Sequence, residues 1–312
     1  AELGFRDYLS RQGVAVDITV MDCAQDKSKI AAFRDRIRAE RPDLVYAFGT
    51  TVTAELAGTT GHRDPAIHIT DIPVLFGLVA TPVRSALVPA FGETGTNVTG
   101  VSHVPQTETQ AQALANLLPA SGRVGIIYNP AEDNAVQQAE AWDAESKKGH
   151  FTLLRQPVPL DAAGAPDATR LTEAAHALAA QKPDVVVLPS DSFLLANDKE
   201  ITRAFTDAGV PTFATVEKYV RNGSALMGLV CNYNSVGRFM GHKARQILVE
   251  KKPAGTVPVE TLEQFTLLLN MPVAHALQCY PPVRQLAFAE VIQAAPDAPA
   301  AKPASTPGRE GR

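Results

Sequence analysis

The sequence predicts an α/β fold of two lobes, each built around a doubly wound parallel sheet. Short apolar runs alternate with amphipathic helical patterns along the chain, which is typical of βα units and a parallel sheet. The alternation completes one series and then restarts at residues 108–118. A length of 312 residues also exceeds that of one ordinary domain. We therefore expect two lobes rather than one barrel.

The first series of elements begins with a helix. Over residues 2–12 the apolar side chains recur on one face, and Gly13 is a typical helix stop. Residues 44–48 are continuously apolar, as expected of a strand buried on both faces. The other elements expected in this series are, in chain order, a strand over 14–20, a helix over 28–40, a helix over 51–57, a strand over 73–78, a helical stretch up to residue 90 and a strand over 98–101.

The second series repeats the rhythm. Residues 124–128 and 185–188 are again continuous apolar runs that predict buried strands. Helices are expected over residues 108–118, 136–148, 171–181, 198–208, 235–250 and 272–277, and further strands over 151–158, 211–214 and 266–270. Residues 294–312 are rich in Ala, Pro and Gly, so we predict a disordered tail there.

Composition excludes several classes of function. A net charge of -4 without a Lys/Arg cluster argues against a nucleic-acid surface. No run of about 18 apolar residues is present, so no membrane-spanning segment is predicted. Cys23, Cys231 and Cys279 are widely spaced and form no Cys-x-x-Cys motif, which indicates neither a disulfide framework nor a zinc site. We expect no metal and no cofactor.

Three of the predicted strands stop at short polar loops, and a helical pattern follows each loop. In an open α/β sheet, ligands bind where the carboxyl ends of the strands meet the following helices. At Gly49-Thr50-Thr51, free backbone N–H groups and hydroxyls suit a carboxylate or phosphate. The alternative is that Thr50 or Thr51 only caps its own helix.

The other two loops carry carboxylates and amides. In Asn129-Pro130-Ala131-Glu132-Asp133-Asn134, Glu132 can pair with an ammonium group, although an acidic residue is also favoured in a first helical turn without any ligand. In Pro189-Ser190-Asp191-Ser192, Asp191 suits an α-amino group, and the alternative is an ordinary Asx or N-cap loop. These side chains together suit a small zwitterionic ligand.

The sequence favours binding over catalysis. The seven histidines form no short-range metal pattern, and there is no Gly-x-Ser-x-Gly and no Gly-x-x-x-x-Gly-Lys-Ser/Thr motif. No nucleophile stands beside a base in the three polar loops. We therefore predict that the protein is not an enzyme.

The polar loops belong to an ordered set of motifs. The set comprises Gly49-Thr50, Pro82-Val83, Gly95-x-Asn97-Val98-Thr99-Gly100-Val101-Ser102, Asn129-Pro130-x-Glu132-x-Asn134, Pro189-Ser190-Asp191, Gly237-Arg238-x-x-Gly241 and Pro258-Val259-Glu260-Thr261. In this order the motifs resemble the substrate-binding proteins of ABC importers, in particular the family that includes tryptophan- and tyrosine-binding components. The resemblance covers about residues 1–280.

The resemblance implies a type I periplasmic-binding-protein fold, in which two flavodoxin-like lobes are joined by a hinge and close on the ligand. The first lobe is expected to contain residues 1–104 and 226–254, and the second residues 105–225 and 255–285. By carry-over, the ligand-binding residues are Gly49, Thr50, Thr51 and Thr81 in lobe one, Asn129, Glu132, Asn134, Ser190 and Asp191 in lobe two, and Asn232 at the return to lobe one.

The resemblance also implies a function. We expect an extracytoplasmic or periplasmic protein, lipid-anchored or free, that delivers a small amino-acid-like solute to an ABC permease and its ATPase subunits. The alternative is a ligand sensor on the same fold that signals to a membrane kinase. Neither function involves nucleic acid.

The chain departs from the family pattern at several places, among them Ala135, Ser192 and Asn232, which stand where the family commonly has Ser, Asn and Asp. Ala80-Thr81-Pro82-Val83 stands where the family often has Thr-Asp-Pro-Val, so one acidic group is absent and the choice of ligand changes. The chain also opens inside the first helix, whereas the family begins with a strand. In a flavodoxin-like sheet, losing the first strand leaves inner strand edges unpaired. We therefore expect an upstream segment with this strand and an export signal.

Overall fold

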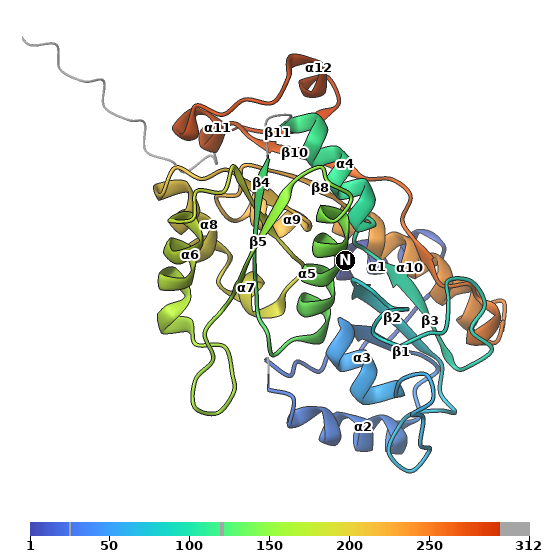
Figure 1. Ribbon diagram of the computed structural model, residues 1–312. Helices are drawn as coiled ribbons and strands as arrows, with labels where there is room; N and C mark the ends of the chain where they lie inside the picture. Colours follow the sequence, from blue (N-terminus) through green and yellow to red (C-terminus); the bar gives the residue numbers. More distant parts are fainter. Residues whose placement is uncertain (25, 119–121, 294–312) are drawn as a thin grey trace, which may run out of the picture.

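The computed structural model describes residues 1–24, 26–118 and 122–293, and the predicted disordered tail lies outside this part of the chain. Two β-sheets of different size form the centres of two lobes, and helices cover both sheets (Figure 1). Among the described helices, none combines the length and the apolar character that a bilayer crossing requires.

The smaller sheet is entirely parallel and has the order β1-β2-β3-β9. Its strands are β1 (Val45–Phe48), β2 (Val74–Val79), β3 (Val98–Ser102) and β9 (Glu260–Thr261). The helices of this lobe are α1 (Glu2–Arg11), α2 (Lys29–Glu40), α3 (Thr50–Ala57), α10 (Tyr233–Leu248) and the short η2 (Ala254–Thr256). Every residue of β2 is buried, as expected for a parallel strand covered on both faces.

The larger sheet has the order β11-β10-β8-β7-β6-β4-β5 and is parallel except where β10 meets β8. Its strands are β4 (Arg123–Tyr128), β5 (Thr152–Pro157), β6 (Val185–Leu188), β7 (Thr212–Ala214), β8 (Met227–Val230), β10 (Thr266–Asn270) and β11 (Ala289–Ile292). Its helices are α4 (Thr107–Leu117), α5 (Asp133–Ser146), η1 (Ala168–Arg170), α6 (Leu171–Ala179), α7 (Ser192–Ala196), α8 (Asp198–Asp207), α9 (Glu217–Arg221), α11 (Met271–Leu277) and α12 (Val283–Leu286).

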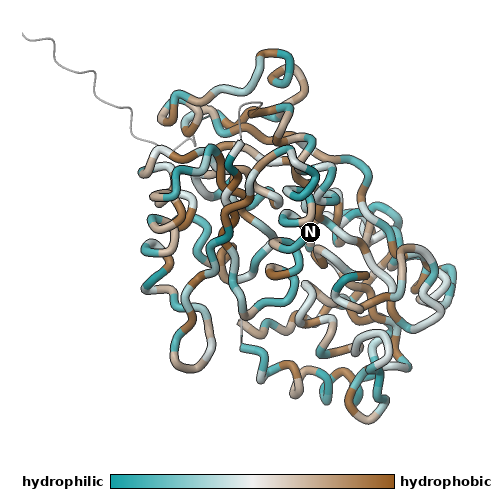
Figure 2. Tube along the Cα trace, viewed as in Figure 1, coloured by the Kyte–Doolittle hydropathy of each residue, from teal (hydrophilic) through white to brown (hydrophobic). Residues whose placement is uncertain are grey.

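The strands carry the core of each lobe. β6 is buried at every position and lies between β7 and β4 in the interior of the larger sheet, where hydrophobic residues concentrate (Figure 2). Trp142 on α5 is buried and packs with Phe213 and other residues of one face of this sheet. Burial of such runs is the main driving force for folding, and it explains why continuous apolar segments marked the strands.

The chain passes between the lobes at residues 103–106, 231–232 and 262–265. β8 pairs with β7 and β10 in the larger sheet, whereas the predicted first lobe included residues 226–254. η2 packs in the smaller lobe and β9 pairs with β3, whereas the predicted second lobe included residues 255–285. A strand belongs to the sheet that supplies its hydrogen-bond partners, and residue spacing does not reveal those partners.

Two predicted elements of the first series are absent from the described structure. Residues 14–20 form neither strand nor helix, and β2 is the only described strand that pairs with β1. Val14 and Ile18 pack against the core of the smaller lobe. The alternation of apolar and polar residues over 14–20 therefore reflects burial of these side chains without strand pairing. Residues 81–90, predicted as a helical stretch, are a succession of turns and bends. Two prolines and a glycine close to this segment disfavour a continuous helix.

Helix α1 packs closely along α10, and glycines permit this approach. A Cβ atom added at Gly237 would lie 1.8 Å from the backbone oxygen of Ala1, and one added at Gly4 would lie 2.1 Å from the backbone oxygen of Asn234. A Cβ atom added at Gly241, one turn further along α10, would likewise lie too close to the side chain of Tyr8. The Gly-Arg-x-x-Gly motif therefore holds two helices together, and this role is structural.

A buried lysine joins α10 to β9. The side chain of Lys243 is 1% exposed, and its Nζ lies 2.5 Å from Glu260 Oε2. It also donates to the backbone oxygen of Pro258 and lies over the ring of Phe239. Burial lowers the pKa of Lys243, and Glu260 acts in the opposite direction. The Pro-Val-Glu-Thr motif therefore anchors the last crossing between the lobes, because removing one partner would leave a buried charge unpaired.

Candidate functional site

The candidate site lies where two polar loops of the larger lobe meet. β4 and β6 are parallel neighbours in the sheet, so the loops that follow their carboxyl ends lie side by side. The first loop contains Asn129 and Glu132, and the second contains Ser190 and Asp191. Asp191, Asn129 and Ser190 are buried, whereas Glu132 is half-buried.

The two carboxylates link the loops to each other. The backbone N–H of Asn129 donates to Asp191 Oδ2 at 2.6 Å. In return, the backbone N–H of Ser192 donates to Glu132 Oε2 at 2.9 Å, and the Ser192 hydroxyl donates to Glu132 Oε1 at 3.0 Å. Asp191 Oδ1 also accepts from the backbone N–H of Leu194 at 2.9 Å and so caps α7. Each loop thus depends on the carboxylate of the other.

Amide side chains of α5 complete this cluster. Asn134 Nδ2 donates to the backbone oxygen of Ser190 at 2.8 Å. Gln138 makes two hydrogen bonds with the backbone of Ser190. Its Nε2 donates to the Ser190 oxygen at 2.9 Å, and its Oε1 accepts from the Ser190 N–H at 3.0 Å. Gln138 was not predicted as a site residue. Its position four residues after Asn134, on the same helix face, is the signal that would have identified it.

The carboxylates lie in an environment that disfavours their charge. Burial, together with the charge of the nearby Glu132, raises the pKa of Asp191 to about 7, whereas the backbone N–H groups that donate to Asp191 act in the opposite direction. Burial also raises the pKa of Glu132, whereas the hydrogen bonds from Ser192 and the charge of Lys27 oppose this shift. Lys27 belongs to the smaller lobe. The hydrogen-bond partners of both carboxylates are neutral groups, so a ligand cation would relieve the cost of burying them.

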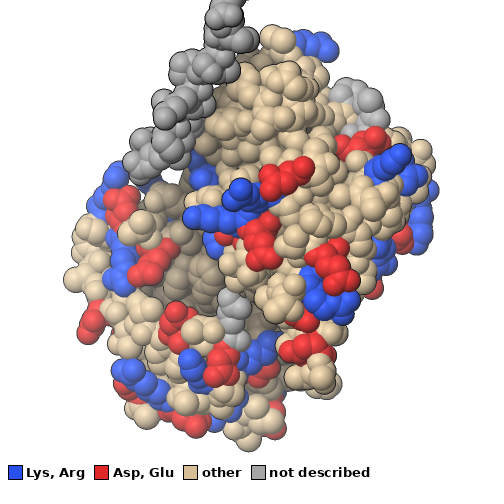
Figure 3. Space-filling model, turned by 90° about the vertical axis from the view of Figure 1, so that its left-hand side faces the viewer, with Lys and Arg blue, Asp and Glu red and all other residues tan. Residues whose placement is uncertain are grey.

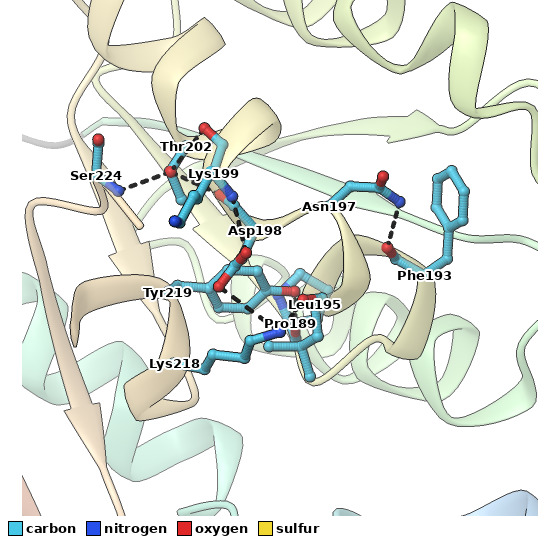
Figure 4. Close-up of polar contacts among 10 residues, drawn as sticks. All are labelled: Pro189, Phe193, Leu195, Asn197, Asp198, Lys199, Thr202, Lys218, Tyr219 and Ser224. Carbon is cyan, nitrogen blue, oxygen red and sulfur yellow. Dashed lines mark hydrogen bonds and ion pairs between the residues drawn. The ribbon is translucent and has the colours of Figure 1, made fainter. Parts of the chain in front are cut away.

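The loop after β6 and the helix α7 that follows it are held by α9, and Asp198 of α8 contacts Lys218 of α9 (Figure 4). The hydroxyl of Tyr219, which is fully buried, donates to the backbone oxygen of Pro189 at 3.0 Å. Lys218 Nζ donates to the backbone oxygen of Leu195 at 2.5 Å and lies 3.7 Å from Asp198. These contacts fix the backbone on both sides of Asp191, and a site built on such a support is preorganised.

The residues predicted in the smaller lobe stand apart from this cluster. Gly49 is the N-cap of α3, with a φ of 84° that favours glycine, and its N–H donates to the backbone oxygen of Gly77 at 2.9 Å. Thr50 and Thr51 are half-buried in the first turn, and neither is the cap residue. The proposal that a threonine caps its own helix is therefore not what the structure shows.

Two further predicted residues make local or interlobe contacts. Asn232 is the N-cap of α10, and its Oδ1 accepts from the backbone N–H of Ser235 at 3.1 Å. Thr81 is half-buried, and its hydroxyl donates to Gln137 Oε1 of the opposite lobe at 3.0 Å.

His103 is a buried residue near the site that sequence reasoning missed. It lies at the first crossing between the lobes and is 2% exposed. Its Nε2 is 3.5 Å from the hydroxyl of Ser190. Its ring packs edge-on against the ring of Tyr233, the first residue of α10, which follows the second crossing. Burial lowers the pKa of His103 to about 4, so the ring is neutral at pH 7. An isolated histidine in a connection offers no pattern that would have singled it out.

The space-filling view shows a hollow in one face of the molecule, with acidic and basic side chains interspersed around it (Figure 3). A separate cavity of about 370 Å³ is lined by Glu108, Gln112 and His150, among others. It also contacts Val124 near the start of β4, the strand end opposite the polar loops, so it is not part of the candidate site. Within residues 1–24, 26–118 and 122–293, no three His, Cys, Asp or Glu side chains form a group that could hold a metal ion.

Comparisons with known proteins give one consistent result. A model of the ABC transporter substrate binding protein family matches residues 2–290 of the chain. The tyrosine-binding protein of Clostridioides difficile is 24% identical over 267 residues, which cover 86% of this chain and 72% of that protein. A conserved domain protein from Vibrio cholerae superposes with a TM-score of 0.79 at 23% identity, over 93% of both chains.

A second solved structure is similar to nearly the same extent. The ABC domain in complex with L-Trp from Streptococcus pneumonia has a TM-score of 0.78 at 24% identity, over 93% of this chain and 94% of that chain. These likenesses confirm the predicted fold class, an α/β architecture of two lobes of the type I periplasmic-binding-protein kind.

Proposed function

Because the chain belongs to the ABC transporter substrate-binding protein family, we propose that it captures a small amino-acid-like solute between its lobes and delivers it to a membrane permease. The observation that carries this proposal is the pair of carboxylates, Glu132 and Asp191, on adjoining loops with only neutral hydrogen-bond partners. Such a pair favours a ligand with an ammonium group, because charge-assisted hydrogen bonds are strong in a buried setting.

An aromatic amino acid is the ligand that the relatives favour. One relative is a tyrosine-binding protein, and one structural neighbour was solved with L-Trp. Both relatives are about one quarter identical to this chain, so the choice between these amino acids rests on experiment.

The proposed binding step uses the predicted residues of both lobes. The ammonium group of the ligand binds between Asp191 and Glu132, with Asn129, Asn134 and Ser190 shaping the loops around it. The ligand carboxylate docks at the first turn of α3, beside the N-cap Gly49, where Thr50 and Thr51 offer backbone N–H groups and hydroxyls. The hinge segments then allow the lobes to close, and the exclusion of water strengthens both sets of contacts.

The partners follow from the family. We propose that the closed protein docks on an ABC permease, whose ATPase subunits drive transport, and that it does so outside the cytoplasm. The protein itself performs no chemical step in this scheme.

A thermal-shift screen tests the proposal. L-tryptophan or L-tyrosine at about 100-fold above its Kd should stabilise the protein by about 2.7 kcal/mol, because it binds only the folded state. For a protein of this size this corresponds to a rise in melting temperature of roughly 5 °C. Sugars and nucleosides serve as controls. A folded sample that responds to a sugar or a nucleoside, and to no amino acid, would contradict the proposal.

A further inference from the structure

The turn segment that follows β2 contacts α5 of the opposite lobe. The Thr81 hydroxyl donates to Gln137 Oε1 at 3.0 Å, and Gln137 Nε2 donates to the backbone oxygen of Arg84 at 3.2 Å. Arg84 Nη2 lies 3.3 Å from Glu140 Oε2. These four residues, which we call the interlobe clasp, join the lobes away from the three hinge segments.

Gln137 is the central residue of the interlobe clasp. Its amide oxygen accepts from Thr81, and its amide nitrogen donates to the backbone oxygen of Arg84. A single side chain therefore makes two interlobe hydrogen bonds. The Arg84–Glu140 pair is about half exposed on both sides, and such pairs contribute little in water. Gln137 is half-buried, and its hydrogen bond with Thr81 is partly shielded from solvent, whereas its hydrogen bond with Arg84 is exposed.

We propose that the interlobe clasp stabilises the closed arrangement of the lobes and thereby sets the affinity for every ligand by the same factor. The effect on affinity rests on the proposed function, whereas the effect on lobe closure does not. A ligand that binds only the closed form has an apparent Kd equal to its intrinsic Kd divided by the closed fraction. A contact that acts only on closure therefore changes all affinities in parallel and leaves selectivity unchanged.

The test compares Gln137→Ala with a matched control. Gln137→Ala should weaken the binding of L-tryptophan and of L-tyrosine by the same factor, about 3- to 10-fold, since two ordinary hydrogen bonds are lost. Small-angle X-ray scattering of the ligand-free variant should show a larger radius of gyration than that of the wild type. Gln156→Ala is the control, because Gln156 is also half-buried and donates to Pro157 within the larger lobe. It should change neither quantity.

Three outcomes would overturn the inference. If Gln137→Ala weakened one amino acid much more than the other, Gln137 would be a ligand contact rather than a closure contact. An unchanged radius of gyration would show that the contact does not hold the lobes together, and an equal effect of Gln156→Ala would show that the effect is not specific. If neither amino acid bound the wild-type protein, the proposed function would fail, and the scattering comparison alone would decide whether the clasp exists.

Discussion

Asp191→Ala is expected to weaken the binding of L-tryptophan and L-tyrosine by roughly 30- to 1000-fold, equivalent to about 2–4 kcal/mol. The change removes the carboxylate that holds the ligand ammonium. It also removes the acceptor for the backbone N–H groups of Asn129 and Leu194, so the two loops lose their link. Titration calorimetry gives the affinity directly, and circular dichroism shows whether the variant is folded.

Asp167→Ala is a matched control for that prediction. Asp167 also caps a short helix, and its carboxylate accepts from the backbone N–H of Thr169, but it lies in the connection before α6. Loss of a cap alone should cost about 1 kcal/mol of stability in either variant. Affinity should fall only in Asp191→Ala. A comparable loss of affinity in both variants would show that the effect comes from capping.

The pH dependence of binding gives an independent readout of the same carboxylate. Burial raises the pKa of Asp191 to about 7, so below that pH the group is largely protonated and carries no charge to hold an ammonium. A ligand cation stabilises the ionised form, so the affinity of the wild type should rise between pH 5 and pH 8. In Asp191→Asn, which has no titratable group at this position, the rise should be lost or much smaller.

Gly237→Val is expected to lower the free energy of unfolding by about 2–3 kcal/mol, which corresponds to a melting temperature lower by roughly 5 °C or more. A Cβ atom at this position would lie 1.8 Å from the backbone oxygen of Ala1, so α1 must move away from α10. Backbone atoms cannot rotate aside as a flexible side chain does. The separation would expose Phe5 and Leu9, which lie on the buried face of α1.

Thermal unfolding monitored by circular dichroism measures this effect. Gly122→Val is the matched control, because an added Cβ at Gly122 lies within 4 Å of no other atom of the described residues. That variant should melt within about 1–2 °C of the wild type, as most surface changes do. An unchanged melting temperature for Gly237→Val would mean that the contact between α1 and α10 contributes little to the folded state.

The main elements of the fold followed from the sequence because buried parallel strands have a distinctive pattern. Residues 124–128 of β4 and residues 185–188 of β6 are buried throughout and contain no charged side chain, and each run ends at a turn signal. Shorter elements were missed. α7 and α9 have five residues each and β9 has two, so none of them spans enough residues to show a period.

The part of the candidate site that depends on the order of strands in the sheet was predictable. Loops that follow parallel strands of one lobe were expected to meet, and Asn129, Glu132 and Asp191 do form one cluster. The hydrogen bonds from each loop to the carboxylate of the other were not predictable, because an N-cap role alone would account for an acid at either position, and Asp191 does also cap α7. Gln137 and His103 were missed for the same physical reason. Their partners come from distant segments, and only the folded chain brings them together.

The most direct test of the account compares L-tryptophan with 3-(indol-3-yl)propionic acid, which has the same ring and carboxylate but no amino group. Calorimetric titration of the wild-type protein should show that the analogue binds at least about 100-fold more weakly, because the buried carboxylate of Asp191 and the half-buried carboxylate of Glu132 are then left without a cation. Equal affinities for the two compounds would contradict the claim that this pair recognises the ammonium group of the ligand.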